Sequence, residues 1–103
     1  MGDILLDRKL FLCFVRIHIL YHASEGEIYG AWMMDELARH GYSLSPGTLY
    51  PILHEMEDDG LLHSRRVVVN GKVRRVYQAT EDGLNALELA KNRIKELFSE
   101  VIS

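Results

Sequence analysis

Cysteine and proline are scarce in this sequence: one cysteine and two prolines occur among 103 residues. A single cysteine excludes an internal disulfide framework, and its place in the apolar run 10–20 predicts that Cys13 is a buried, unreactive thiol. No stretch reaches the roughly 18 consecutive apolar residues of a membrane span, and residues 1–10 lack the pattern of a secretory signal. The sequence therefore predicts an intracellular, cytoplasmic protein with no membrane partner.

Catalytic and cofactor motifs are also missing. No glycine-rich phosphate loop follows a predicted strand, and no nucleophile elbow is present. His18 and His22 have the four-residue spacing of a metal-binding pair on a helix, but no third ligand lies nearby in the sequence. We therefore predict no catalytic residue, no metal site and no cofactor, and a function other than catalysis.

Basic residues are fewer than acidic residues overall but are concentrated in one segment. The formal net charge is −3, from 12 basic and 15 acidic residues. Residues 61–80 nevertheless contain no acid and five bases, which are Arg65, Arg66, Lys72, Arg74 and Arg75. Because salt screens charges beyond about 8 Å, a polyanion responds to this local field rather than to the net charge. One basic face on an acidic body is compatible with binding DNA.

Apolar spacing predicts two helices before the basic segment. Residues 7–23 are apolar on nearly every side, which indicates a helix buried in a core or against a partner. A loop at residues 24–27 leads to a second helix over residues 30–40, which stops at Gly41 because glycine suits the left-handed conformation past a helix end. Trp32, Met33 and Leu37 are expected on one face of this second helix.

The third predicted helix has clear boundaries. Ser45 is a suitable N-cap, Pro46 suits the first helical position, and Gly60 ends the helix. Its spacing gives an inward apolar stripe of Leu49, Ile52, Leu53 and Met56, and an outward stripe of Tyr50, His54 and Glu57.

The pattern then changes to that of a hairpin and a last helix. Residues 61–69 are rich in β-branched residues and end at Asn70-Gly71, the strongest short hairpin motif, so residues 72–79 are the returning strand. Thr80 can cap a helix over residues 81–101. The order of elements predicts a mainly α, α+β fold, with a winged helix-turn-helix domain at residues 1–80 and an added C-terminal dimerisation helix at residues 81–103.

Three segments resemble one protein family. Residues 45–62, SPGTLYPILHEMEDDGLL, closely resemble the recognition helix and exit turn of the PadR family of transcriptional regulators. Residues 71–83, GKVRRVYQATEDG, resemble that family's second wing strand and the start of its last helix, and residues 29–37, YGAWMMDEL, resemble its second helix more loosely. The resemblance covers roughly residues 29–87, and the short last helix is similar to the one-helix subgroup. It implies a dimeric regulator that binds double-stranded DNA, commonly as a repressor, and that in some members responds to phenolic acids or hydrophobic drugs.

The predicted DNA contacts lie at the start of the third helix and along the hairpin. A helix entering the major groove presents its first turn to phosphates and base edges, and basic wing residues add sequence-independent affinity. The candidates are Ser45, Gly47, Thr48, Tyr50, Pro51, His54, Arg65, Lys72, Arg74 and Arg75. Two alternatives stay open: a serine-proline-glycine cap with Tyr50 packed under the wing, and a hairpin whose charge only keeps an edge strand soluble.

Four acidic residues in the third predicted helix are unfavourable for a DNA contact along the whole length of that helix. Glu55, Glu57, Asp58 and Asp59 crowd its C-terminal half, where they would repel phosphates. Insertion of the N-terminal end alone would tolerate them. We also hypothesise that Glu55 accepts a salt bridge from a wing arginine.

Exposed apolar residues on the first and last helices predict a homodimer. The expected contacts are Phe11, Phe14, Leu87, Ala90, Ile94, Leu97 and Val101, the last five at coiled-coil spacing. The alternative is a last helix that folds back on its own domain. Trp32 is the candidate wall of a pocket for a small hydrophobic or phenolic effector, and its alternative is a place in the core.

These patterns together predict a sequence-specific DNA-binding transcriptional regulator, a repressor that binds a palindromic operator as a homodimer. The alternative is a winged-helix protein-docking module whose basic hairpin binds an acidic partner.

Overall fold

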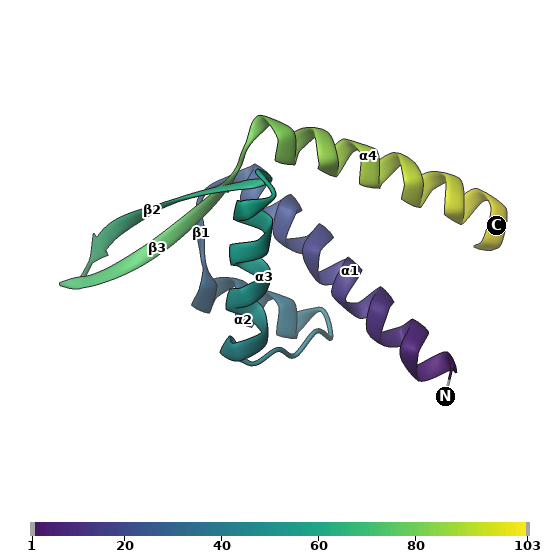
Figure 1. Ribbon diagram of the computed structural model, residues 1–103, viewed down its shortest axis with the longest axis horizontal. Coiled ribbons are helices and arrows are strands. Elements are labelled where there is room, and N and C mark those ends of the chain that lie inside the picture. Colours follow the sequence, from purple (N-terminus) through teal and green to yellow (C-terminus); the bar gives the residue numbers. More distant parts are fainter. Residues whose placement is uncertain (1, 103) are drawn as a thin grey trace.

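The computed structural model describes residues 2–102 as a helix-turn-helix unit with a projecting hairpin and two long outer helices (Figure 1). The elements in chain order are α1 (Gly2–Glu25), β1 (Ile28–Tyr29), α2 (Gly30–Arg39), α3 (Pro46–Asp58), β2 (Leu62–Val69), β3 (Lys72–Ala79) and α4 (Glu81–Leu97), followed by a π-helical turn, η1 (Phe98–Ile102). The order of the helices and hairpin strands confirms the predicted winged helix-turn-helix fold. The short strand β1 is not among the predicted elements.

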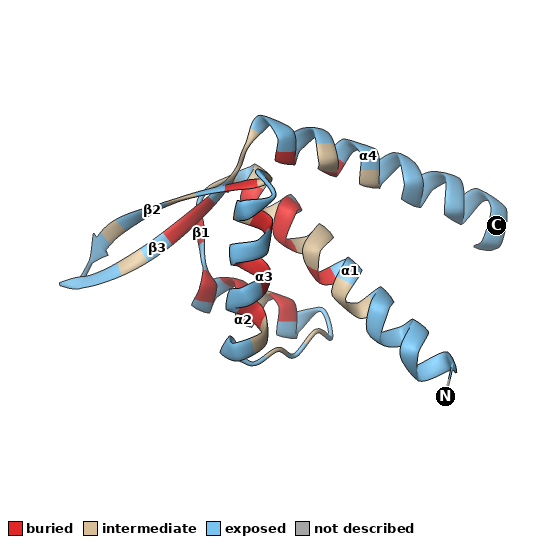
Figure 2. Ribbon diagram, in the orientation of Figure 1, coloured by how far each residue is buried: buried red, intermediate tan, exposed pale blue. Residues whose placement is uncertain are grey.

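Helix α1 is longer than predicted, and only its C-terminal part enters the core. Val15, Ile19, Leu20 and Ala23 are buried, whereas residues 2–10 are exposed (Figure 2). The prediction of a buried Cys13 is wrong, because its side chain is exposed. Cys13 lies in the part of α1 that precedes the first buried residue, Val15, and its side chain lines an open apolar cleft between α1 and α4.

The hydrophobic core lies where α1, α2, α3 and the sheet meet. Met33 and Leu37 of α2 pack there against the inward stripe of α3 and against Leu62 and Tyr77 of the hairpin. Trp32 does not share their face and is 41% exposed. Consecutive residues of a helix are about 100° apart, so burial of Met33 turns its neighbour outward.

Helix α3 begins and ends as predicted. Ser45 occupies the N-cap, Pro46 is the first helical residue, and Gly60 has a φ of +79° just past the last turn. The Ser45 hydroxyl accepts no backbone hydrogen bond and lies 3.3 Å from the Thr48 hydroxyl instead. Ser45, Pro46 and Gly47 are exposed, so the first turn of α3 lies at the surface.

The sheet has the strand order β1-β3-β2 and is antiparallel throughout. Val69 pairs with Lys72 across the two-residue turn, in which Asn70 and Gly71 have φ values of +51° and +76°. These positive values are the conformation that an Asn-Gly turn favours. The hairpin keeps its register along its whole length and projects well beyond the helices (Figure 1).

Helix α4 is held at its start and exposed toward its end. The Thr80 side chain accepts a hydrogen bond of 3.0 Å from the Gly83 amide, as an N-cap should. Leu87 reaches the core, but residues 91–102 are all exposed (Figure 2). The radius of gyration is 14.8 Å, compared with about 13 Å for a compact domain of this length. The excess arises from the projecting hairpin and the two outer helices.

Candidate nucleic-acid interface

The first turn of α3 offers a surface that suits an anion. Ser45, Gly47 and Pro51 are exposed and Thr48 is half-buried, whereas Leu49 on the inner side is fully buried. The turn contains no acidic residue, and the amides of Thr48 and Leu49 both donate to the Ser45 carbonyl at 3.0 Å. A Cβ added to Gly47 would meet only the Ser45 hydroxyl, at 3.8 Å, so another molecule can approach this backbone closely. The positive end of the helix dipole adds to the attraction for phosphate.

The Tyr50 side chain packs against α2 on one side and is exposed to solvent on the other. A Cβ placed on Gly30 would lie 2.5 Å from the Tyr50 hydroxyl, so the tyrosine ring rests directly on the start of α2. The side chain is still 38% exposed. His54, one turn further along the same face, is exposed as predicted. Tyr50 therefore packs against a neighbouring helix and remains accessible to a ligand.

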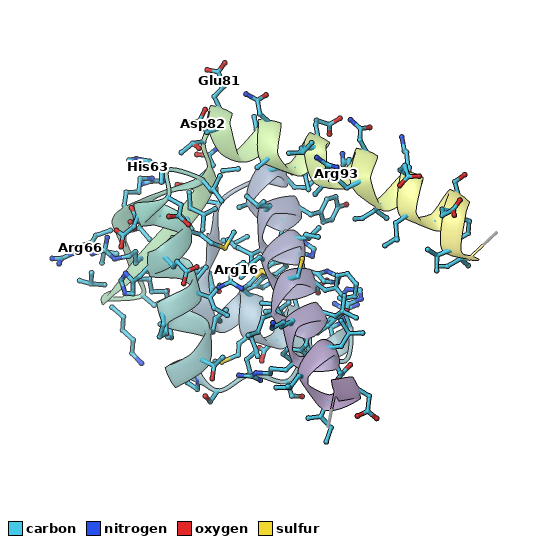
Figure 3. The ribbon with its side chains drawn as sticks, turned by 45° about the vertical axis from the view of Figure 1, so that its right-hand side comes forward. Arg16, His63, Arg66, Glu81, Asp82 and Arg93 are labelled. Carbon is cyan, nitrogen blue, oxygen red and sulfur yellow. The ribbon has the colours of Figure 1, made fainter. Side chains whose placement is uncertain are left out.

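The register of the hairpin shows that its four arginines lie on two opposite faces. Residues that pair across antiparallel strands point to the same face, and neighbours along a strand alternate. Arg66 pairs with Arg75, and Ser64 on the same face pairs with Tyr77, whose side chain packs into the core beside α3. Arg66 and Arg75 are therefore on the face of the wing that turns toward α3. Arg66 is exposed and points outward from the hairpin (Figure 3).

Arg65 and Arg74 lie on the opposite face and are already engaged. Arg65 donates two hydrogen bonds of 2.7 Å to the two carboxylate oxygens of Glu27. This contact lowers the pKa of Glu27 and raises that of Arg65, in both cases chiefly through the hydrogen bond. The Arg74 guanidinium lies 4.7 Å from the centre of the Tyr29 ring, a cation–π contact. Both arginines therefore hold the wing to the segment around β1.

A chain of hydrogen bonds joins the wing to α3. Arg75 donates to the Ser64 hydroxyl at 2.9 Å. That hydroxyl and the Ser64 amide both donate to one oxygen of Glu57, at 2.7 and 3.0 Å. Glu57 therefore faces the hairpin, although the sequence placed it on the outward stripe. Burial raises the pKa of the neighbouring Tyr77.

The hypothesis of a salt bridge between Glu55 and a wing arginine is wrong. Glu55 accepts a hydrogen bond of 3.1 Å from Arg16 of α1. The Arg16 side chain lies between α1 and α3 (Figure 3). A glutamate two positions before Glu57 is about 200° around α3, so it faces α1 while Glu57 faces the hairpin. Glu55 and Glu57 thus have partners inside the chain, and the acids lie at the end of α3 opposite Ser45.

Arg66 is not among the DNA-contact candidates named from the sequence, which include arginines on both faces of the hairpin. Lys72 is exposed beside the turn, where it was expected. The Asn70-Gly71 turn could have identified Arg66, because a two-residue turn fixes the register and places Arg66 opposite Arg75. The partners of Arg65 and Arg74 lie around β1, which the sequence did not predict as a strand.

The predicted dimerisation residues occupy two kinds of environment. Leu87 is 5% exposed in the chain's own core, Phe11 packs on Tyr42 with 5.1 Å between ring centres, and Ala90 is half-buried. The more exposed members are Phe14, Ile94, Leu97 and Val101, which are 38%, 45%, 54% and 67% exposed. An apolar cleft of about 380 Å³ lies between α1 and α4 and is lined partly by Phe14, Ile94 and Leu97.

Trp32 lines a separate, shallow cavity. It has a volume of about 280 Å³ and includes His22, Glu25, Glu27 and Tyr29 among its walls. Two carboxylates in so small a cavity make it less suited to an apolar effector than the cleft between α1 and α4. Within residues 2–102, no helix combines the length and apolar character that crossing a membrane requires.

The chain is similar to known regulators over most of its length. A model of the transcriptional regulator PadR-like family matches residues 19–89. Transcriptional regulator Rv3488 of Mycobacterium tuberculosis is 54% identical over 88 residues, which cover 85% of this chain and 82% of that protein. A PadR family transcriptional regulator from Eggerthella lenta has a crystal structure with a TM-score of 0.81 and 28% identity, covering 97% of this chain and 90% of that one. A PadR-like transcriptional regulator from Bacillus cereus has a TM-score of 0.75 and 31% identity, covering 93% and 90% of the two chains.

Proposed function

The chain belongs to the PadR-like family of transcriptional regulators, and from this premise we propose that it represses transcription by binding a palindromic operator as a homodimer. The family and these relatives regulate transcription, so the protein is a DNA-binding regulator and, as predicted, not an enzyme. A dimer bound across an operator excludes other proteins by occupancy alone, which is why repression is the mode we assign. We place this activity in the cytoplasm.

One observation carries the proposal: the start of α3 is exposed and free of acids, and the Arg66–Arg75 face of the wing is the face that contacts α3, through Ser64 and Glu57. We assign Ser45, Gly47 and Thr48 to a DNA phosphate, because they surround the positive end of the helix. Tyr50, Pro51 and His54 follow along the outer face of α3, where a helix in the major groove meets base edges.

The wing supplies affinity that does not depend on sequence. We assign phosphate contacts to Arg66, Lys72 and Arg75, whose charges release counterions from DNA when they bind. Arg65 and Arg74, which were also candidates, act in this proposal by fixing the wing through Glu27 and Tyr29.

The homodimer is supported by the exposed apolar surface of the two outer helices. The first half of α1 exposes Ile4, Leu5 and Leu6, and the end of α4 exposes Leu97 and Phe98. Leu97 also lines the cleft between α1 and α4, and in this proposal a second copy of α4 covers the cleft and the exposed ends of both helices. Two-fold symmetry would then present two copies of α3 to one face of DNA, about 34 Å apart or closer if the DNA bends.

The test begins with selection of a binding site from random duplexes, followed by titrations of the selected site at several salt concentrations. We expect a palindrome. Replacing Lys72 or Arg66 by Gln should weaken binding to every sequence and reduce the slope of log affinity against log salt by about 0.9 for each phosphate that the variant no longer neutralises.

Replacing His54 by Ala should instead change which sequence is preferred, with the salt slope unchanged. Lys95→Gln is a matched control for charge, since Lys95 is an exposed residue of α4, away from α3 and the wing. Binding without sequence preference even at low salt would refute the proposal and favour the alternative, a docking module for an acidic protein segment.

A further inference from the structure

Three histidines that are scattered in the sequence meet on one side of the molecule. His18 and His22 are one turn apart on α1, and His40 directly follows α2. One ring nitrogen from each lies within 4.8 Å of the others. Among the described residues, this is the place where three histidine, cysteine or acidic ligand atoms come this close. His40 therefore supplies the third ligand that the sequence did not show near His18 and His22.

The carboxylate of Glu36 completes the cluster. Its Oε2 lies 3.4 Å from His22 Nε2 and 3.0 Å from His40 Nε2. Its other oxygen, Oε1, accepts a hydrogen bond of 3.1 Å from Arg39, which fixes the orientation of the group. The Glu36 side chain is only 12% exposed. A nearly buried carboxylate that faces two imidazoles provides the negative charge a bound cation would need.

These separations are close to those of a tetrahedral metal site. With bonds of about 2.0 Å to nitrogen or oxygen, tetrahedral ligands lie about 3.3 Å apart. The two distances from Glu36 Oε2, 3.4 and 3.0 Å, are close to this value, and the three imidazole nitrogens lie within 4.8 Å of one another. His18 and His40 stack with 5.0 Å between ring centres, so binding an ion requires their nitrogens to move closer together.

The surroundings of His18 favour its neutral form, which is the form that binds metals. Burial lowers the pKa of His18, and the neighbouring His40 and His22 lower it further. Tyr42 and Trp32 pack against the cluster, with ring centres 5.2 Å from His18 and His22 respectively. These rings limit the access of water to His18 and His22, whereas the His40 side chain is 48% exposed.

We propose that His18, His22, His40 and Glu36 form a binding site for Zn²⁺ or a similar divalent transition-metal ion. Three imidazoles and one carboxylate are a ligand set that suits this class of ion rather than Mg²⁺ or Ca²⁺, which prefer oxygen ligands. Glu36 occupies the fourth position through Oε2, and Arg39 holds it there.

The position of the site suggests that the ion is a regulatory ligand, an inference that rests on the proposed function. His40 begins the turn that leads into α3. His18 lines a second apolar cavity, which shares Phe14, Ile17 and Ile94 with the cleft where we place the second subunit. A metal bond from α1 to His40 would fix the angle between the dimerisation helices and the helix that contacts DNA. Metal binding would therefore change the spacing of the two DNA-reading helices and with it the affinity for the operator.

The first experiment measures metal binding alone, so its result is independent of DNA. Full-length protein is stripped with a chelator, titrated with ZnCl₂ in a calorimeter, and examined with Co²⁺ for the visible absorption of tetrahedral coordination. We expect one ion per chain. His40→Gln should weaken zinc binding at least about 100-fold and Glu36→Gln about tenfold or more.

His63→Gln is the control, because it removes an exposed histidine of β2 and should bind zinc like the wild type. Equal zinc affinities for the wild type and His40→Gln, or a wild type without a tetrahedral cobalt spectrum, would overturn the site. The cobalt spectrum needs no variant, so a variant that fails to fold does not prevent a decision.

The second experiment tests the regulatory role with the selected operator. Zinc should change the operator affinity of the wild type several-fold and leave that of His40→Gln unchanged. If zinc binds but both proteins keep the same operator affinity, the regulatory role is refuted. If neither protein binds DNA while the wild type binds zinc, the proposed DNA function fails and the metal site stands.

Discussion

Gly83 is the residue with the tightest backbone contact around the last helix. It lies in the first turn of α4, and a Cβ added there would overlap the backbone oxygen of Leu61. The same oxygen accepts a hydrogen bond of 3.1 Å from the Thr80 amide, and the Thr80 hydroxyl donates a hydrogen bond of 2.5 Å to the Gly60 carbonyl. The exit of α3, the end of β3 and the start of α4 therefore meet at one crowded junction.

We expect Gly83→Ala to destabilise the protein by roughly 2–3 kcal/mol, because the added methyl group must push backbone apart. Helix propensity alone would give the opposite sign, since alanine is favoured over glycine by about 1 kcal/mol. Urea unfolding followed by circular dichroism measures the difference. Asn85→Ala, at an exposed position of the same helix, should change stability by less than about 0.5 kcal/mol. Equal effects of the two substitutions would contradict the crowded junction.

Single residues show what a sequence can and cannot predict. Pro46, Asn70 and Gly71 act through their own backbone conformations, so their places at the start of α3 and in the hairpin turn were predicted correctly. Ser45 occupies the predicted N-cap position, but its hydroxyl accepts no backbone hydrogen bond. The partners of Glu55 and Arg65 come from α1 and from the segment before β1, about 40 positions away in the chain. Local spacing contains no information about such contacts, which is why Glu55 was given the wrong partner.

The wing and α3 form one unit at the scale of secondary-structure elements. Glu57 connects them by accepting two hydrogen bonds from Ser64, and Ser64 in turn accepts one from Arg75. This contact fixes the angle between the helix that we assign to base edges and the strand pair that we assign to phosphates. A loose wing would lose part of the DNA affinity even with every basic residue present.

We expect Glu57→Ala to lower stability by about 1–2 kcal/mol and to weaken operator binding, because the half-buried amide and hydroxyl of Ser64 lose their acceptor. Asp58→Ala is the matched control: it removes the same charge from the next, exposed position and should strengthen DNA binding slightly by removing repulsion. Unfolding curves and operator titrations of both variants provide the measurement. Tighter operator binding by Glu57→Ala would show that charge, not the contact with Ser64, governs this position.

Elements were easier to predict than their mutual positions. Cap residues and the Asn-Gly turn located α2, α3 and the hairpin to within a residue or two, since these features depend on neighbours in the chain, whereas α1 begins five residues before its predicted start. The strand β1 has only two residues and forms through pairing with Val76 and Tyr77, so no local periodicity could indicate it. The meeting of His40 with α1 likewise depends on how α2 packs.

At the scale of the whole molecule, the two outer helices leave more apolar surface uncovered than one subunit needs. Leu97 and Val101 continue the seam that begins in the core at Leu87, but they contact solvent over more than half of their surface. The first half of α1 is similarly exposed. A second subunit is the proposed cover, and it would also pair two DNA-reading helices on one duplex.

Leu97→Glu tests this arrangement because it places a charge in the middle of the proposed contact. Burying a carboxylate where leucine should pack would weaken the dimer by at least about 2 kcal/mol, which is roughly thirtyfold in dissociation constant. Analytical ultracentrifugation over a range of concentrations should show a dimeric wild type and a variant that dissociates at higher concentration.

Asn92→Glu adds the same charge to an exposed position on the other side of α4 and should stay dimeric. The DNA result then follows from symmetry. A monomer contacts one half-site, so Leu97→Glu should lose most of its preference for the full palindrome but keep its affinity for an isolated half-site. If Leu97→Glu sediments like the wild type at every concentration, α4 does not form the dimer contact, and the spacing of the two α3 helices must be set by another surface.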